Sequence, residues 1–210
     1  MQRKIHNQTL FVAALSVYLG LLIVGAPPQV LAQTLTATNQ ENQSDKSEET
    51  NKKFVDFGNK LKALAKGGKL DSFDITIQAD AVNKNFLNQQ IIIASGDKEF
   101  VDLLQELAPA FIESYFGQFS ASQIDWSLRG DKTEINSNIS FKVASEQKAR
   151  SVASGLNLYF SMLREAKQNT NEGVIFNETT VTQENDQIFI VTRLPRAGLD
   201  AFLKSDEKAN

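Results

Sequence analysis

The chain has 210 residues, of which 22 are Lys or Arg and 25 are Asp or Glu, so its formal net charge at pH 7 is −3. It contains no cysteine, and its one histidine, His6, lies close to the N-terminus. The mildly acidic balance argues against a nucleic-acid partner, because nucleic-acid-binding domains carry a strong basic excess. The lack of cysteine excludes thiol nucleophiles and cysteine-ligated metal sites.

The first residues follow the order of a secretory signal peptide. Arg3 and Lys4 form a short basic start, residues 10–25 form an uncharged apolar run, and residues 30–32 (VLA) end in the small residue that signal peptidase requires. We predict that residues 1–32 are a cleaved signal peptide. Cleavage would remove the only histidine and change the formal charge from −3 to −5.

An uncleaved N-terminal anchor is the alternative for this segment. Its run of 16 apolar residues would span only about 24 Å, whereas the hydrocarbon core of a bilayer is about 30 Å thick. We therefore expect membrane contact only if the leader is retained. A cysteine-free exported domain fits a bacterial envelope better than a eukaryotic secretory pathway, where disulfides are common. The sequence predicts a periplasmic or extracellular location.

A polar tail follows the leader. Residues 33–53 contain few apolar residues and no aromatic one, so they are predicted to be a disordered linker. Residues 54–210 then form one predicted α+β domain, which begins with a short helix over residues 54–66 that Gly67 and Gly68 end. Its apolar residues recur at helical spacing: Phe54, Phe57, Leu61 and Leu64.

The same short helix is also basic. A basic amphipathic helix can lie on a membrane surface, but one of three to four turns is expected to pack on its own domain instead. Its basic residues, with one that follows the helix, are Lys60, Lys62, Lys66 and Lys69.

A weak internal repeat organises the rest of the chain. Three times a strand-like segment leads into a helix start, in residues 90–104, 138–152 and 187–203. Each is preceded by another strand-like segment, and the turn signals Gly130-Asp131 and Asn185-Asp186 mark two hairpins. The pattern predicts an antiparallel sheet from about three β-hairpins with helices packed on one face, in a ββα-ββα-ββα order. The preceding strand-like segments are residues 73–79, 124–128 and 174–182.

Two helices and one strand supply most of the predicted core. The helix over residues 98–117 is apolar over much of its circumference, and Pro109 is expected to kink it or end it early. The helix over residues 146–168 has a core stripe that includes Phe160, and the strand over residues 134–143 points Phe141 inward.

Three Ser-x-x-Lys matches are the strongest catalytic motifs. They begin at Ser95, Ser145 and Ser205. Penicillin-binding proteins and β-lactamases place this motif at a helix start, but their Ser-Asp-Asn and Lys-Thr-Gly motifs are absent here. Because the first two serines lie where a strand enters a helix, we predict that they cap the helix rather than act as nucleophiles.

Two groups of carboxylates could do acid–base work without histidine. They are predicted to lie on outward faces and turns, where solvated charge is the ordinary case. The groups are Asp125, Asp131 and Glu134 in one hairpin, and Glu178, Glu184 and Asp186 in the other. We expect no metal site, no nucleotide site and no cofactor, because the chain has neither a calcium-binding loop nor a glycine-rich phosphate loop.

One surface feature predicts an interaction. Leu158 and Met162 lie about 160–200° from the core stripe of their helix at 100° per residue, so they are candidate partner-facing residues for another protein or for self-association. The alternative is that a loop or the N-terminal helix buries them.

Taken together, these features predict an exported bacterial envelope protein with a non-catalytic binding or scaffolding role. A small hydrolase using carboxylates or a Ser/Lys pair, and a carrier of a small apolar ligand, are the alternatives.

Overall fold

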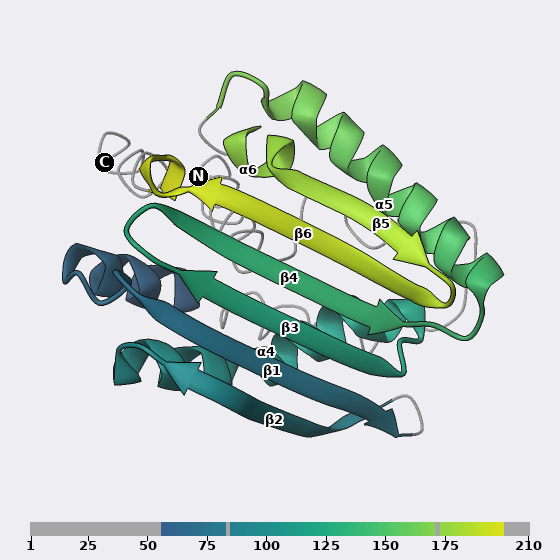
Figure 1. The fold of residues 1–210 in the computed structure, drawn as a ribbon, viewed down its shortest axis with the longest axis horizontal. Coiled ribbons are helices and arrows are strands. Elements are labelled where there is room, and N and C mark those ends of the chain that lie inside the picture. Colours follow the sequence, from purple (N-terminus) through teal and green to yellow (C-terminus); the bar gives the residue numbers. More distant parts are fainter. Residues whose placement is uncertain (1–55, 83–84, 171–172, 200–210) are drawn as a thin grey trace, which may run out of the picture.

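The protein is an α+β domain built on one antiparallel sheet (Figure 1). The computed structural model describes residues 56–82, 85–170 and 173–199. The predicted signal peptide, the predicted linker, Phe54 and the third Ser-x-x-Lys match at Ser205 lie outside these residues. Six strands pair antiparallel throughout, in the order β2-β1-β3-β4-β6-β5. The strands are β1 (Phe73–Val82), β2 (Asn85–Ser95), β3 (Gln123–Gly130), β4 (Glu134–Lys142), β5 (Thr179–Glu184) and β6 (Gln187–Pro195).

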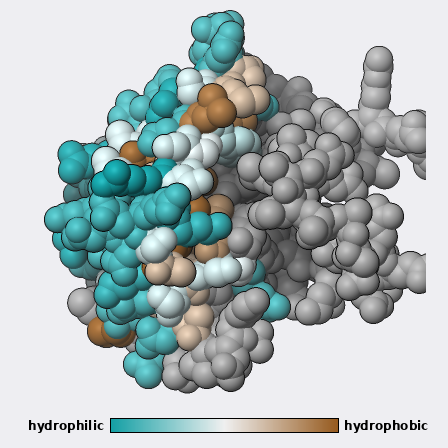
Figure 2. All heavy atoms as spheres, turned by 90° about the vertical axis from the view of Figure 1, so that its right-hand side faces the viewer, coloured by the Kyte–Doolittle hydropathy of each residue, from teal (hydrophilic) through white to brown (hydrophobic). Residues whose placement is uncertain are grey.

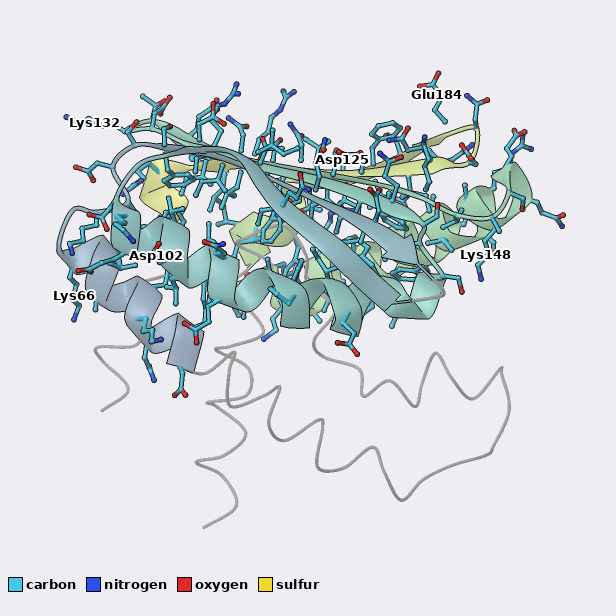
Figure 3. All side chains as sticks on the ribbon, turned by 90° about the horizontal axis from the view of Figure 1, so that it is seen from below. Lys66, Asp102, Asp125, Lys132, Lys148 and Glu184 are labelled. Atoms are coloured by element: carbon cyan, nitrogen blue, oxygen red, sulfur yellow. The ribbon has the colours of Figure 1, made fainter. Side chains whose placement is uncertain are left out.

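Helices cover one face of this sheet and leave the other face open, as predicted (Figure 3). No helix among the described residues is long and apolar enough to cross a membrane. Besides helical residues 56–66 and 196–199, the helical elements are α4 (Lys98–Phe116), the 3-10 turn η1 (Gly117–Phe119), α5 (Glu146–Lys167) and α6 (Gly173–Asn177).

The three predicted hairpins are present, but the threefold ββα repeat is not established. Helices α4 and α5 follow the first two hairpins, β1-β2 and β3-β4. After β5-β6 only residues 196–199 are described as helical. The segments before the hairpins also differ, since the short helix α6 lies between α5 and the third hairpin, whereas the 3-10 turn η1 lies between α4 and the second.

Two predicted elements are corrected by the structure. Residues 174–177 belong to α6 and not to a strand. Ile175 and Phe176 are adjacent and both buried, which suits a helical turn and not strand alternation. The predicted early end of α4 at Pro109 is also wrong, because the helix continues to Phe116, while the alternative of a kink there stays a prediction. Pro109 and Gln105 are both exposed, so water can bond the Gln105 carbonyl, which the missing N–H leaves free.

The core lies between the sheet and the helices. On β4 the predicted alternation is confirmed, because Ile135, Ile139 and Phe141 are buried while the intervening residues are exposed or half-buried. Trp126 of β3 is fully buried, and its indole N–H donates to Ser137 Oγ at 3.2 Å. Ring contacts join this inner face to α4 and η1, with centroid distances of 5.0 Å for Phe111–Trp126, 5.1 Å for Phe116–Phe141 and 5.7 Å for Phe119–Phe141.

The two edges of the sheet are protected in different ways. At β5, helix α5 covers the edge: Asn157 Nδ2 donates to the Val181 carbonyl at 3.2 Å, and Arg164 Nη2 donates to the Thr179 carbonyl at 2.5 Å. At β2, two register shifts interrupt the pairing with β1, and one of them leaves Ile92 without a partner. Capped carbonyls and bulges both hinder the addition of another strand. Neither edge is therefore well suited to bind a partner by strand addition.

Candidate functional site

The serine of the second Ser-x-x-Lys match is a helix cap, as predicted. Ser145 is the N-cap of α5, and its Oγ accepts a hydrogen bond from the Lys148 backbone N–H at 3.2 Å. For the first match the prediction is wrong, because the N-cap of α4 is Asp97, whose Oδ1 accepts from the Glu99 N–H at 2.9 Å. The chain turns at Gly96, where φ is +128°, so the helix begins too late for Ser95 to cap it.

The capping role of Ser145 gives a stability prediction. Ser145→Ala should lower the free energy of unfolding by about 1 kcal/mol, and Ser145→Asp should be nearly neutral because aspartate also caps. Lys148→Met should not change stability. Urea denaturation of the three variants measures this. A fluorophosphonate or β-lactam that labels the wild type but not Ser145→Ala would contradict the cap and indicate a nucleophile.

The predicted carboxylate groups do not converge. Asp125 lies on the open face of the sheet, and Glu184 lies near one end of it (Figure 3). Asp131 has a structural role in the β3–β4 turn, since its Oδ1 accepts from the Thr133 hydroxyl at 2.6 Å and from the Thr133 and Glu134 N–H groups. These bonds lower the pKa of Asp131, the hydrogen bond from the Thr133 hydroxyl being the largest cause.

A groove between the helix at residues 56–66 and α4 does gather carboxylates. Its volume is about 430 Å³, and Lys60, Lys69, Glu99, Asp102 and Glu106 line it with apolar residues beneath. Lys69 pairs with Glu99 at 2.6 Å and Lys60 with Glu106 at 3.4 Å. The two glutamate side chains are 68% and 73% exposed. Solvated, ion-paired carboxylates lack the burial that prepares an acid for catalysis.

The charges along this groove explain the basic helix. Its apolar residues Phe57, Leu61 and Leu64 are buried in the domain, so the helix packs on the domain and does not present an apolar stripe to a membrane. Lys60 of this helix and Lys69, which follows it, instead pair with Glu106 and Glu99 of α4. The sequence analysis did not predict this pairing of basic and acidic residues. The signal is present, because Glu99, Asp102 and Glu106 recur at helical spacing and indicate an acidic stripe.

Neither a metal nor an apolar ligand finds an evident site in the described part of the chain. No group of three acidic or histidine residues there could hold a metal ion. The apolar space among Leu61, Phe73, Phe100 and their neighbours is only about 10 Å³. That volume is close to one water molecule and far below the several hundred cubic ångströms of a ligand pocket.

The open face of the sheet is mainly polar. Cross-strand rows run across it, such as Gln78–Asp125–Ser140. Phe189 and Val191 of β6 are half-buried within this face. On the right-hand side of the view in Figure 1, which faces the viewer in Figure 2, the described residues are mainly hydrophilic, with hydrophobic residues in small separate patches.

The outer face of α5 exposes the two candidate partner-facing residues. Leu158 is 66% exposed and Met162 is 60% exposed, so neither the helix at residues 56–66 nor a loop in the described part of the chain buries them. Helix α5 lies along one border of the molecule beside β5 (Figure 1). The opposite side of α5 holds it on the sheet through Ala149, Ala153, Leu156 and Phe160, which are buried. The two apolar side chains are therefore presented on a rigid helix.

Tyr159, between these two faces, has a buried hydroxyl that no described residue hydrogen-bonds. Burial raises its pKa to about 12. The folded protein therefore keeps this proton above pH 10, where the unfolded chain begins to lose it. The protonated Tyr159 phenol therefore makes its full contribution to the free energy of unfolding below pH 10. This contribution is lost as the pH rises towards about 12.

Replacing Tyr159 tests this environment. Tyr159→Phe should be neutral or stabilising by about 1 kcal/mol at pH 7, because it removes a hydroxyl without a partner. Its advantage over the wild type should grow between pH 10 and pH 12, since phenylalanine does not titrate. Urea midpoints at pH 7 and pH 11 measure both effects. Equal losses for the two proteins at pH 11 would contradict the buried phenol.

Comparison with known proteins finds no family model, no curated protein and no solved structure that matches this chain.

Proposed function

We propose that the protein is a non-catalytic binding module of the bacterial envelope, and that the outer face of α5 is its binding surface. The observation that carries the proposal is the exposure of Leu158 and Met162 one turn apart on a helix fixed to the sheet. Exposed large apolar side chains lose contact with water when a partner covers them, and this is the main favourable term in protein association. Their position on a rigid element limits the entropy lost on binding.

The arrangement of charge supports binding over catalysis. Among the described residues, the gathered carboxylates are exposed and paired with lysines, and Ser145 is engaged as a cap. A hydrolase needs an acid, base or nucleophile whose pKa or position is tuned by its surroundings.

The alternative of a small apolar ligand would need an enclosed cavity much larger than the about 10 Å³ beneath the sheet.

Export remains part of the proposal and rests on the N-terminal sequence alone. A tagged full chain expressed in a bacterium should appear in the periplasm or medium with Gln33 as its first residue. N-terminal sequencing of the fractionated protein measures this. Full-length protein that stays in the membrane fraction would instead support the anchor.

The binding surface is tested by adding charge to it. The variant Leu158→Glu/Met162→Glu should no longer capture the proteins that the wild-type chain captures from an envelope extract. The reason is that burying a charged side chain in an apolar interface costs free energy. The control Gln78→Glu/Asn138→Glu adds the same charge to the open sheet face, where both residues are exposed. Capture that both variants lose equally, or that neither loses, would contradict α5 as the surface. Circular dichroism confirms that each variant is folded.

A further inference from the structure

The outer stripe of α5 has an unusual composition for a solvent-facing helix. Eight residues of α5, Leu158 included, lie within about 60° of Leu158 at 100° per residue, and only one of them, Glu165, is charged. Solvent-facing stripes of globular proteins are usually rich in charge. The stripe consists of Gln147, Ser151, Ser154, Gly155, Leu158, Ser161, Met162 and Glu165, all exposed.

We infer that this stripe binds a second copy of the chain, with α5 packing antiparallel against α5 of the other copy about a twofold axis at Leu158. The inference rests on the proposed function and names the partner of that same surface. In a twofold contact each residue lies opposite a residue of the identical patch, so the patch must be complementary to itself.

The side-chain sizes along α5 meet this condition. An axis at Leu158 places Met162 of one copy opposite Ser154 of the other, and Ser161 opposite Gly155. A Cβ added to Gly155 would meet nothing within 4 Å, so the surface there has room for a side chain from outside. Large residues set against small ones let two helices approach closely and interlock.

The charges select the antiparallel orientation. Glu165 lies opposite Ser151 of the other copy and therefore one helical turn from its Lys148. Among the described residues neither side chain forms an ion pair, whereas Arg150 of α5 already pairs with Glu146. The antiparallel contact brings Glu165 and Lys148 together at both ends. A parallel contact would instead place Glu165 beside Glu165 and Lys148 beside Lys148.

The size of the stripe predicts a weak dimer. The 22 residues of α5 give a contact about 33 Å long and about 10 Å wide on each copy, or roughly 650 Å² in total. A stable interface usually buries at least about 1,000 Å². We therefore expect monomers in dilute solution, and dimers at high concentration or when chains are held side by side.

Single-cysteine variants test the geometry cleanly, because the chain has no cysteine. Under mild oxidation, full-chain Leu158→Cys should form far more disulfide-linked dimer than Asn138→Cys, an exposed position on the open sheet face. A mixture of Ser154→Cys and Met162→Cys should form mixed dimers. Each alone should not, since its two copies would lie about 12 Å apart, beyond the reach of a disulfide. Yields equal to Asn138→Cys, or efficient Ser154→Cys homodimers, would overturn the inference.

Charge reversal gives an independent measurement. Sedimentation equilibrium of Glu165→Lys should show association weaker by on the order of threefold to tenfold, and Glu165→Lys/Lys148→Glu should restore it. An unchanged association constant for Glu165→Lys would contradict the antiparallel pairing.

The two proposals fail in distinguishable ways. If Leu158→Cys does not cross-link but capture from the envelope still depends on Leu158 and Met162, self-association is wrong and binding of another protein by this face stands. If the dimer forms as predicted but capture is independent of α5, this inference stands and the binding function of the face towards other proteins is wrong.

Discussion

Phe141→Ala should lower the free energy of unfolding by about 3–5 kcal/mol, the cost of removing a buried phenylalanine and leaving a cavity. Phe141 is 1% exposed, as predicted from the alternation of its strand. Its ring contacts Phe116 of α4 and Phe119 of η1, at centroid distances of 5.1 and 5.7 Å. The ring therefore holds the end of α4 on the sheet. Its loss should weaken the packing of both the sheet and the helices that cover it.

A neighbouring phenylalanine provides the control for Phe141→Ala. Phe189 of β6 lies between the buried Ile188 and Ile190 but points to the open face, opposite Ser140, and is half-buried. Phe189→Ala should cost only about 1 kcal/mol, because less of its surface is removed from water. Urea denaturation of both variants makes the comparison. Losses of equal size would mean that the two faces of the sheet are not distinguished by burial.

Phe160→Ala should also cost about 3–5 kcal/mol, because this side chain joins α5 to the sheet. Phe160 is 1% exposed and continues the buried stripe that includes Ala153 and Leu156. The effect should appear as a lower urea midpoint at protein concentrations where the chain is monomeric. A normal midpoint would show that α5 is not held on the sheet by this contact.

Leu158 gives the matched control on the same helix. Leu158→Ala should change stability by no more than about 0.5 kcal/mol, because its side chain is exposed and alanine is a good helix former. The same variant should weaken the self-association proposed for α5. Comparing Leu158→Ala with Phe160→Ala therefore distinguishes the two faces of α5. The first variant should weaken association, and the second should lower the free energy of unfolding.

Local rules were sufficient where a residue's neighbours in the sequence decide its environment. The alternation in β4 predicted that Phe141 is buried, the helical period in α5 predicted that Phe160 is buried, and the position of Ser145 between strand and helix identified a cap. Turn signals likewise located the β3–β4 and β5–β6 hairpins. These features depend on contacts within a few residues, so periodicity and capping rules predict them.

Contacts between distant segments decided the remainder. No local pattern states that β1 pairs with β3, or that β6 inserts between β4 and β5, because a strand's alternation does not specify which edge it joins. Phe73 approaches Gly96 so closely that Gly96 has no room for a side chain. The chain turns at this glycine, and α4 therefore begins after Asp97, which caps it in place of Ser95.

The candidate surface shows the same division. The sequence by itself determined which residues of α5 point away from its core stripe, because the helical period fixes their direction. Only the tertiary structure decided that no other described element covers them. Helix α5 packs on the β5 edge through Asn157 and Arg164, which cap the Val181 and Thr179 carbonyls, and this packing leaves Leu158 and Met162 facing solvent. Exposure depends on what the rest of the chain places over a helix face, and that is set by long-range packing.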